Sequence, residues 1–164
     1  MRFELEQRFD AGSAAVIRAY ADPDLYPTLV GLPKLGGIEV LDHSATADRA
    51  KLRVRFAFTG HLPAAVTAVV DPKRLTWVQE TDHDLLGGTT TFRLVPDHYA
   101  DRLNASGTFR VQDAEAGSGC TRTISGELKV RAAFVAGKVE QAIVSGLAEY
   151  LQAESPAVDR YLAG

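Results

Sequence analysis

Alternation of apolar and polar residues, repeated along most of the chain, is the feature that most constrains its fold. Within residues 51–58, the even-numbered positions from Leu52 to Phe58 are apolar, and the odd-numbered positions from Lys51 to Arg55 are cationic. Successive side chains of a β-strand point to opposite faces, so a period of two indicates a strand with one buried and one solvated face. The chain is therefore predicted to build a sheet that covers a core on one side.

The same period predicts a series of strands separated by short turns. Asp71-Pro72-Lys73 and Gly87-Gly88 are typical turn sequences, and the acidic, glycine-rich segment 113–119 predicts a hairpin loop. Pro63 is compatible with a strand that starts at the next residue, because proline is tolerated at the beginning of a strand. The predicted strands cover residues 2–9, 37–44, 51–58, 64–70, 75–82, 89–95, 102–111 and 121–131. Such a series predicts an antiparallel sheet of seven or eight strands.

Two short helices are predicted between the first two strands. Asp10 or Ser13 can cap a helix over residues 14–20. Asp22 can cap a second short helix that begins at Pro23, where the missing N–H of proline costs nothing.

The end of the chain changes its period from two to three or four. Its apolar stripe consists of Val135, Val139, Ala142, Ile143, Gly146, Leu147 and Tyr150. This spacing predicts an amphipathic helix, and Ser155-Pro156 predicts the end of its regular part or a kink. A regular part of about 20 residues is ~30 Å long. The predicted fold class is therefore α+β, with the long C-terminal helix across the concave face of a curved antiparallel sheet.

Size and charge exclude several classes of protein. A chain of 164 residues fits one domain over residues 1–164, and a formal net charge of −3 gives no sign of a nucleic-acid partner. Cys120 is the only cysteine, so no intramolecular disulfide can form. No secretory signal or membrane-spanning stretch is visible. We expect a cytoplasmic protein, and the excess of Ala and Arg over Lys suggests a bacterial source.

Small residues on the inner face raise the question of a cavity. Ala68, Ala105, Gly107 and Gly126 project little from the predicted sheet, and Ala142 and Gly146 project little from the helix. Glycine inside a strand usually marks a bulge or a close approach. These glycines therefore bend the strands, admit the helix closely or leave open volume, and their clustering favours a cavity between sheet and helix.

Polar residues in the inward register bear on the same question. A buried amide that lacks a hydrogen-bond partner costs about 1–3 kcal/mol. Gln7 and Gln79 therefore either bond neighbouring backbone groups or orient a ligand in an apolar pocket. Arg122 lies near the start of a strand, and we predict that it lies at the solvent rim.

The order of these elements resembles the START-like superfamily, also called SRPBCC or helix-grip, over essentially the whole chain. Residues 11–24 resemble its capped first helix, 71–75 its turn into a central strand, and 119–122 its last hairpin. Residues 25–33, LYPTLVGLP, and 92–101, FRLVPDHYAD, are similar to a bacterial branch, domain-of-unknown-function family 2505. The resemblance implies a hydrophobic cavity for lipids, sterols, polyketides or plant hormones, sometimes with cyclase activity. It implies no universal catalytic residue, and fold alone does not establish function.

Catalytic and metal-binding motifs are not recognised in the sequence. The four histidines, His43, His61, His83 and His98, form no zinc-binding pattern. Asp82 and Asp84 flank His83, but in a strand they point away from it, so this cluster is interpreted as a solvated loop end. No phosphate loop, dinucleotide fingerprint or nucleophile elbow is present, so we expect no cofactor or metal.

The leading hypothesis is a binding protein for an apolar or amphipathic small molecule such as a lipid, sterol or polyketide. The residues predicted to line or gate its pocket are Tyr26, Phe56, Phe58, Trp77, Phe92, Phe109, Val139, Ile143 and Leu147, with Gln7 and Gln79 as polar contacts. One alternative is a cyclase, aromatase or dehydratase that uses His61, His83 or His98. Another is an interaction module with a filled interior.

Overall fold

The computed structural model describes residues 1–68, 70–115 and 117–164. Its strands are β1 (Arg2–Phe9), β2 (Leu35–Ala45), β3 (Arg49–Phe58), β4 (Thr76–Asp84), β5 (Thr89–Pro96), β6 (Leu103–Asp113) and β7 (Cys120–Val130). Its helical segments are α1 (Ser13–Tyr20), α2 (Ala64–Thr67), α3 (Ala136–Ala163) and two 3₁₀ turns, η1 (Pro23–Leu29) and η2 (Pro72–Arg74). Positions 69 and 116, within the predicted strand 64–70 and the predicted loop 113–119, lie outside the described residues.

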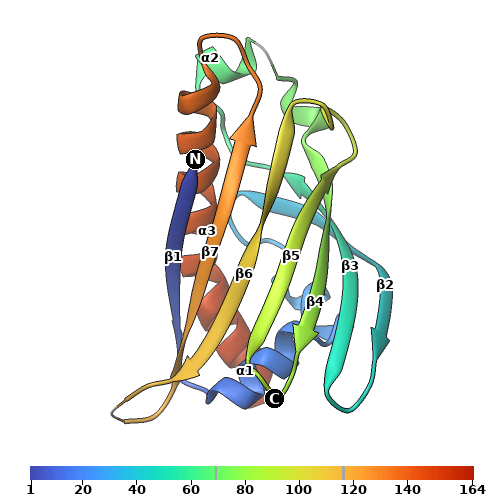
Figure 1. Cartoon of the computed structure of the whole chain (residues 1–164), viewed down its shortest axis with the longest axis vertical. Helices are drawn as coiled ribbons and strands as arrows, with labels where there is room; N and C mark the ends of the chain where they lie inside the picture. Colours follow the sequence, from blue (N-terminus) through green and yellow to red (C-terminus); the bar gives the residue numbers. More distant parts are fainter. Residues whose placement is uncertain (69, 116) are drawn as a thin grey trace.

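The strands form one antiparallel sheet of seven in the order β1-β7-β6-β5-β4-β3-β2. The prediction of a curved antiparallel sheet with a long C-terminal helix is confirmed. In Figure 1 the sheet lies in front of α3, which runs the length of the molecule. We call the end that carries α1 and the C-terminus the lower end, and the end that carries α2 and the β5–β6 loop the upper end (Figure 1).

The alternation in β3 directs its apolar residues to the inner face, where Leu52, Val54 and Phe56 are buried. They form the lower core together with α1, η1 and the last turns of α3. The ring of Phe56 stacks on Trp77 of β4 with 6.0 Å between ring centroids. The predicted half-buried strands therefore orient their side chains as the period of two requires.

A second core cluster covers the middle of the sheet and fills it. Phe92 and Phe109 stack at 4.6 Å between centroids and pack with Tyr150 of α3. A Cβ added at Gly107 would lie 2.9 Å from Phe92 Cε1, and one at Gly126 would lie 2.7 Å from Phe3 Cζ. Both glycines therefore accommodate aromatic rings, and the interpretation that they leave open volume is wrong at these two positions.

The predicted strand over 64–70 is wrong, because this segment begins as the short helix α2. Thr67 Oγ1 donates to the carbonyl oxygen of Ala64, at 3.0 Å, within this single turn. β3 already pairs directly with β4, from Arg49 opposite Asp84 to Ala57 opposite Thr76, so no position is left for a strand between them. An alanine-rich segment without alternation then favours a helical turn.

The prediction that the regular helix ends near Ser155-Pro156 is wrong, since α3 continues to Ala163, and a kink there stays a prediction. Proline in a helix interior costs about 3 kcal/mol or more because it removes a hydrogen bond. Burial of Ala157 and Val158 in the lower core offsets this cost. Asp159 adds hydrogen bonds from the backbone N–H groups of Asp10 and Ala11, at 3.1 and 3.3 Å.

The cap of α1 differs from the prediction as well. The N-cap position is Gly12, and it makes no side-chain cap. Asp113, at the end of β6, instead accepts a hydrogen bond from the backbone N–H of Ser13 at 2.7 Å. A distant carboxylate therefore replaces the local caps that the sequence offered at Asp10 and Ser13.

His83 is buried in the lower half of the sheet, so the prediction of a solvated loop end is wrong for this residue. Its Nε2 lies 2.9 Å from Thr81 Oγ1 and its Nδ1 lies 2.8 Å from Thr90 Oγ1. Burial lowers the pKa of His83 from 6.5 to about 4. The imidazole is therefore neutral at pH 7 and contributes to packing.

This histidine makes folding sensitive to mild acid. Its folded-state pKa lies below its unfolded value, so the stability is full above pH 6.5 and is lost as pH falls toward 4. We expect about 2 kcal/mol of stability to be lost between pH 7 and pH 5, measured by urea unfolding. His83→Gln should flatten this part of the profile, and an equally steep loss in that variant would assign the effect to another group.

Candidate functional site

An apolar pocket of about 80 Å³ lies at the upper end, between the N-terminal half of α3 and the ends of the strands. Its lining residues are Leu62, Val66, Val70, Arg74, Leu75, Thr76, Trp77, Pro96, His98, Tyr99, Arg102, Leu103, Val130, Arg131, Ala132, Val139, Ala142 and Ile143. Most of these side chains are aliphatic or aromatic, and the polar ones come mainly from η2 and the β5–β6 loop. Ligand sites in proteins usually combine an apolar wall with a few polar groups in this way.

The pocket exists because the upper half of α3 carries small residues on its inner side. Ala142 and Ile143 line the pocket, and Gly146 follows Ala142 by about one helical turn. A Cβ added at Gly146 would meet no atom within 4 Å among the described residues. Of the inner-face glycines and alanines identified from the sequence, Ala142 lines the pocket, and Gly146 has free space around its Cα.

The opposite wall is built by strand ends whose side chains are fixed by the sheet. Trp77 near the start of β4 pairs with Phe56 on one side and Pro96 on the other. Stacking on Phe56 positions the indole, and the half-buried ring borders the pocket. Leu103 of β6 and Val130 of β7 face each other in register and extend this wall toward α3.

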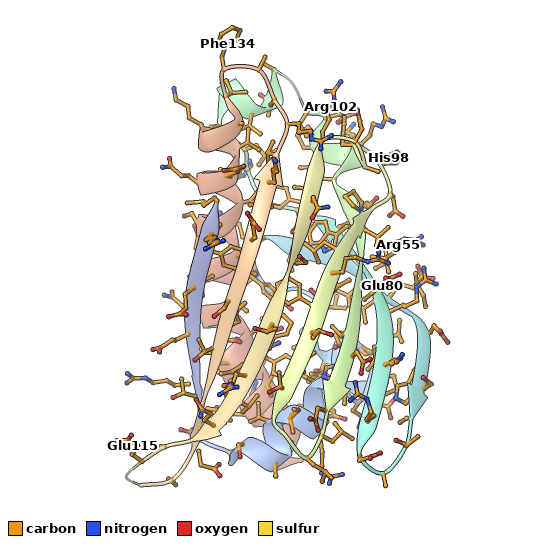
Figure 2. All side chains as sticks on the ribbon, in the orientation of Figure 1. Arg55, Glu80, His98, Arg102, Glu115 and Phe134 are labelled. Atoms are coloured by element: carbon orange, nitrogen blue, oxygen red, sulfur yellow. The ribbon has the colours of Figure 1, made fainter. Side chains whose placement is uncertain are left out.

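The mouth of the pocket carries Arg74, His98, Tyr99 and Arg102. The guanidinium carbons of Arg74 and Arg102 lie 5.4 and 5.8 Å from the centroid of the Tyr99 ring. Arg74 Nη2 also lies 3.3 Å from His98 Nδ1. Tyr99 OH accepts a hydrogen bond from the backbone N–H of Asp71 at 3.1 Å. Figure 2 shows His98 and Arg102 together at the upper end.

A buried polar network fixes the lower half of α3. Arg122 Nη1 donates to Gln7 Oε1 at 2.7 Å and lies 3.6 Å from Glu154 Oε2. The same carboxylate oxygen accepts from Gln7 Nε2 at 3.0 Å and from Tyr20 OH at 2.7 Å. The Arg122 guanidinium carbon lies 3.7 Å from the centroid of the Tyr20 ring. This network connects β1, β7, α1 and α3 through one buried ion pair.

The prediction that Arg122 lies at the solvent rim is wrong, since its residue is only 5% exposed. Its inward register in β7 was visible in the sequence, but its partner Glu154 comes from the distant end of the chain. Gln7 also bonds the Leu151 carbonyl oxygen at 2.9 Å, so its amide is satisfied by protein groups. Burial raises the pKa of Tyr20 well above its ordinary value, so its hydroxyl stays protonated and donates.

A larger, shallow trough of about 420 Å³ crosses the outer face of the sheet. Its charges pair with one another across strands: Glu80 binds Arg93 at 2.6 Å and Arg53 at 3.3 Å, and Asp82 binds Arg49 at 2.6 Å. The hydrogen bond from Arg93 holds the pKa of Glu80 below its usual value. Because these charges neutralise one another in solvent, we interpret the trough as a surface ion-pair ladder.

Of the residues predicted to contact a ligand, three lie together at the pocket, namely Trp77, Val139 and Ile143. Gln79 lies on the inner face of β4 and is half-buried. The others lie elsewhere: Tyr26 and Phe56 in the lower core, Phe92, Phe109 and Leu147 in the middle cluster, Phe58 at the end of β3 and Gln7 in the buried network. Periodicity did not identify Arg74, Tyr99 and Arg102 as site residues, because they lie in turns that are distant in the chain and meet only in the folded structure.

Other chemistry has little support in the described part of the chain. Among residues 1–68, 70–115 and 117–164, no three His, Cys, Asp or Glu side chains are grouped closely enough to hold a metal ion. Cys120 is buried at the start of β7, and burial raises the pKa of its thiol to about 11. Of the three histidines weighed for catalysis, His98 lies at the pocket. Within the described residues, no helix is both long and apolar enough to cross a membrane.

Comparison with known proteins gives a family and a fold. The family described as "Protein of unknown function (DUF2505)" matches residues 4–162. A search of curated proteins finds no match.

Several solved structures share this fold at low sequence identity. A Thermus thermophilus protein is 13% identical, with a TM-score of 0.68 over 99% of this chain and 97% of that one. The Zhui aromatase/cyclase of a Streptomyces species is 15% identical, with a TM-score of 0.66 over 99% and 93%. Norcoclaurine synthase of Thalictrum flavum is 17% identical, with a TM-score of 0.62 over 99% and 86%. These likenesses show the helix-grip fold.

Proposed function

We propose, from the premise that this chain belongs to the DUF2505 family and has the helix-grip fold, that it binds a small apolar or amphipathic molecule at its upper end. The observation that carries the proposal is the pocket beside α3, walled by Trp77, Leu103, Val130, Val139 and Ile143. Burial of apolar ligand surface against such a wall contributes roughly 25 cal/mol per Å².

The size of the pocket bears on how a ligand enters. At about 80 Å³ it is smaller than typical ligand sites of ~300–1,000 Å³. It holds a short alkyl chain or a single ring, and a longer ligand requires the upper half of α3 to move away from the sheet. The buried ion pair between Arg122 and Glu154 holds the lower half of α3, whereas Ala142, Ile143 and Gly146 in the upper half are only half-buried. The upper half is held at Glu140, which accepts a hydrogen bond from the backbone N–H of Val130 at 2.9 Å and lies 3.3 Å from the N-terminal amine. Opening at the upper end would break these contacts.

Trp77 gives a direct readout of binding, because it is the only tryptophan and borders the pocket. Neutral probes such as 1-octanol and 2-naphthol are expected to change its fluorescence saturably. Native mass spectrometry of gently purified protein should in addition reveal any molecule that copurifies. The proposal would be contradicted if Trp77 fluorescence changed linearly and without saturation for every probe, and if the native mass spectrum contained the protein alone.

Filling the pocket should abolish binding without unfolding the protein. Ala142→Leu adds a side chain comparable in size to the pocket, and both residues favour helices. We expect 1-octanol binding to weaken at least about tenfold, with a change in stability of less than about 1.5 kcal/mol. Ser145→Leu, at an exposed position of the same helix, is the matched control and should bind as the original chain does. Equal binding by both variants would place the probe elsewhere.

An enzyme acting on the bound molecule is a second candidate, favoured by the position of His98 at the mouth. A molecule recovered from the protein can be incubated with stoichiometric amounts of the original chain and of His98→Gln. Chemical conversion that requires His98 would establish an enzyme. An unchanged molecule bound equally by both would support a binding protein.

A further inference from the structure

The charge at the mouth of the pocket indicates which ligands it selects. We infer, on the basis of the proposed function, that the ligand is an amphiphile whose anionic group, a carboxylate or a phosphate, binds Arg74 and Arg102 while its apolar part enters the pocket. The pocket lining contains three arginines, Arg74, Arg102 and Arg131, and none of its lining residues is Asp or Glu. This local positive charge contrasts with the formal net charge of −3 of the whole chain.

These three arginines differ from the arginines that form ion pairs with carboxylates. Arg49, Arg53, Arg55 and Arg93 on the outer face all bind acidic side chains, as does buried Arg122. Among the described residues, Arg74, Arg102 and Arg131 form no ion pair. Their guanidinium groups are therefore available to an anion supplied by a ligand.

The acidic residues close to the mouth in the sequence form other contacts or are exposed to solvent. Asp71 accepts a hydrogen bond from the backbone N–H of Lys73 at 3.0 Å and caps η2. Asp97 lies 3.2 Å from Arg55 Nε on the outer face. Asp101 is exposed and forms no ion pair with the neighbouring Arg102 within the part of the chain that the structure describes. Among the described residues, none of these three carboxylates forms an ion pair with Arg74 or Arg102.

The ring of Tyr99 contacts both guanidinium groups. Its ring lies within 6 Å of both guanidinium carbons, at 5.4 Å for Arg74 and 5.8 Å for Arg102. The hydrogen bond from the Asp71 backbone fixes the hydroxyl end of Tyr99. A guanidinium presents a planar set of donors that matches carboxylate and phosphate oxygens. The mouth is therefore pre-organised for an oxyanion, with less side-chain entropy to lose on binding.

The two ends of the site differ in their exposure to solvent, and this difference sets the orientation of the ligand. Arg74 and Arg102 are exposed, whereas Val139 is buried and Trp77 and Ile143 are half-buried. An anionic head at the arginines stays partly hydrated, and the tail passes Trp77 toward α3. The pocket of about 80 Å³ accommodates a short tail or one aromatic ring. A short-chain acid or an acid with one aromatic ring fits this description, and so does a short alkyl phosphate. A medium chain fits if the upper half of α3 moves away from the sheet.

The test compares probes that share a tail and differ in their head. Octanoate, octyl phosphate, 1-octanol and octyltrimethylammonium are titrated below their micelle concentrations while Trp77 fluorescence is recorded. Octanoate or octyl phosphate should bind about tenfold or more tightly than 1-octanol, because hydrogen bonds to charged groups are stronger than neutral ones. The cation should bind most weakly. The better of the two anions identifies the head group.

Variants assign the preference to the arginines. Arg74→Gln combined with Arg102→Gln should reduce the anion preference, taken as the ratio of octanoate to 1-octanol affinity within the same variant, to within about threefold. Arg110→Gln, an exposed arginine of β6 away from the pocket, is the matched control and should keep the preference. In the original chain, added NaCl should weaken octanoate binding and leave 1-octanol binding unaffected, which tests the inference even if the double variant folds poorly.

The outcomes separate this inference from the proposed function. Equal binding of octanoate and 1-octanol would overturn the inference and leave an apolar binding site. Retention of the anion preference in the double variant, or salt-independent octanoate binding, would also overturn it. Failure of all probes to bind would contradict the proposed function itself.

Discussion

Arg122→Met is expected to lower the free energy of unfolding by about 3–5 kcal/mol, because it leaves a buried carboxylate without its cationic partner. Arg122 and Glu154 are each 5% exposed, so water cannot solvate the charge that remains. The substitution also removes the hydrogen bond to Gln7 Oε1 and the guanidinium group from between the rings of Tyr20 and Phe109. Methionine keeps much of the apolar stem, so the loss reports mainly on charge.

A double-mutant cycle separates the cost of the isolated charge from the value of the pair. Arg122→Met with Glu154→Gln removes both charges, and the glutamine oxygen can still accept from Tyr20 OH, which now donates to Glu154 at 2.7 Å. We expect the double variant to recover about half or more of the stability lost in Arg122→Met. The single variant Glu154→Gln completes the cycle, and the two single losses minus the double loss give the coupling energy. Urea unfolding followed by circular dichroism measures each corner of the cycle, with unchanged m-values as the test of validity.

The matched control is Arg110→Met on the outer face of β6. Arg110 is exposed and forms no ion pair among the described residues, so this variant should stay within about 0.5 kcal/mol of the original chain. A similar loss of unfolding free energy in Arg122→Met and Arg110→Met would show that the loss does not come from the buried ion pair. A loss below about 1 kcal/mol at Arg122 would mean that Glu154 finds another partner when the guanidinium group is absent.

The fold was predictable because its main signal is local and repeated. Alternation in β3, β6 and β7 and the three-to-four spacing of α3 each fix which side chains face inward. Once seven such strands precede one long amphipathic helix, few packing arrangements bury every apolar face. The order of the elements and the curved sheet with its helix follow from that restriction.

The errors in the predicted elements have one common cause, namely that distant contacts outweighed a local preference. Pro156 should have ended α3, but burial of Val158 and the bonds to Asp159 hold the last turns in helical form. The segment from Ala64 contains valines that favour strands, yet direct pairing of β3 with β4 leaves it no partner. Neither contact is visible within a short window of sequence.

The candidate site was less predictable than the fold for the same reason. Trp77, Val139 and Ile143 were identifiable from periodicity, because they lie on the inner faces of regular elements. Arg74 and Arg102 lie in or beside turns, whose side-chain directions follow no period. Their approach to Tyr99 depends on a loop in which Tyr99 itself has a positive φ of 60°. Such a loop conformation cannot be read from alternation.

Two glycine-to-alanine variants should have opposite effects, and the contrast shows where the interior is open. Gly107→Ala is expected to destabilise the protein by about 3 kcal/mol, because its Cβ would press against Ser125 O and lie 2.7 Å from the Cα of Gly126. These are backbone atoms of the paired strand, so relief requires the strands to separate. Phe92 Cε1 at 2.9 Å blocks movement toward the interior.

Gly146→Ala is expected to stabilise the protein by about 0.5–1 kcal/mol instead. The added methyl group meets nothing within 4 Å among the described residues, and alanine loses less backbone entropy than glycine on forming a helix. Thermal and urea unfolding of the two variants should therefore differ by about 3.5–4 kcal/mol, summed from these two effects. Probe binding should be unchanged in Gly146→Ala, because one methyl group leaves most of the space open.

The direction of the stability change in Gly146→Ala tests how tightly the upper half of α3 packs on the sheet. If the upper half of α3 packed tightly on the sheet, a methyl group there would be as damaging as at Gly107, and both variants would lose stability. Stabilisation at Gly146 together with destabilisation at Gly107 is the result expected when the middle of the sheet is filled and α3 is loosely packed around Gly146. A molecule that binds between α3 and Trp77 depends on that difference.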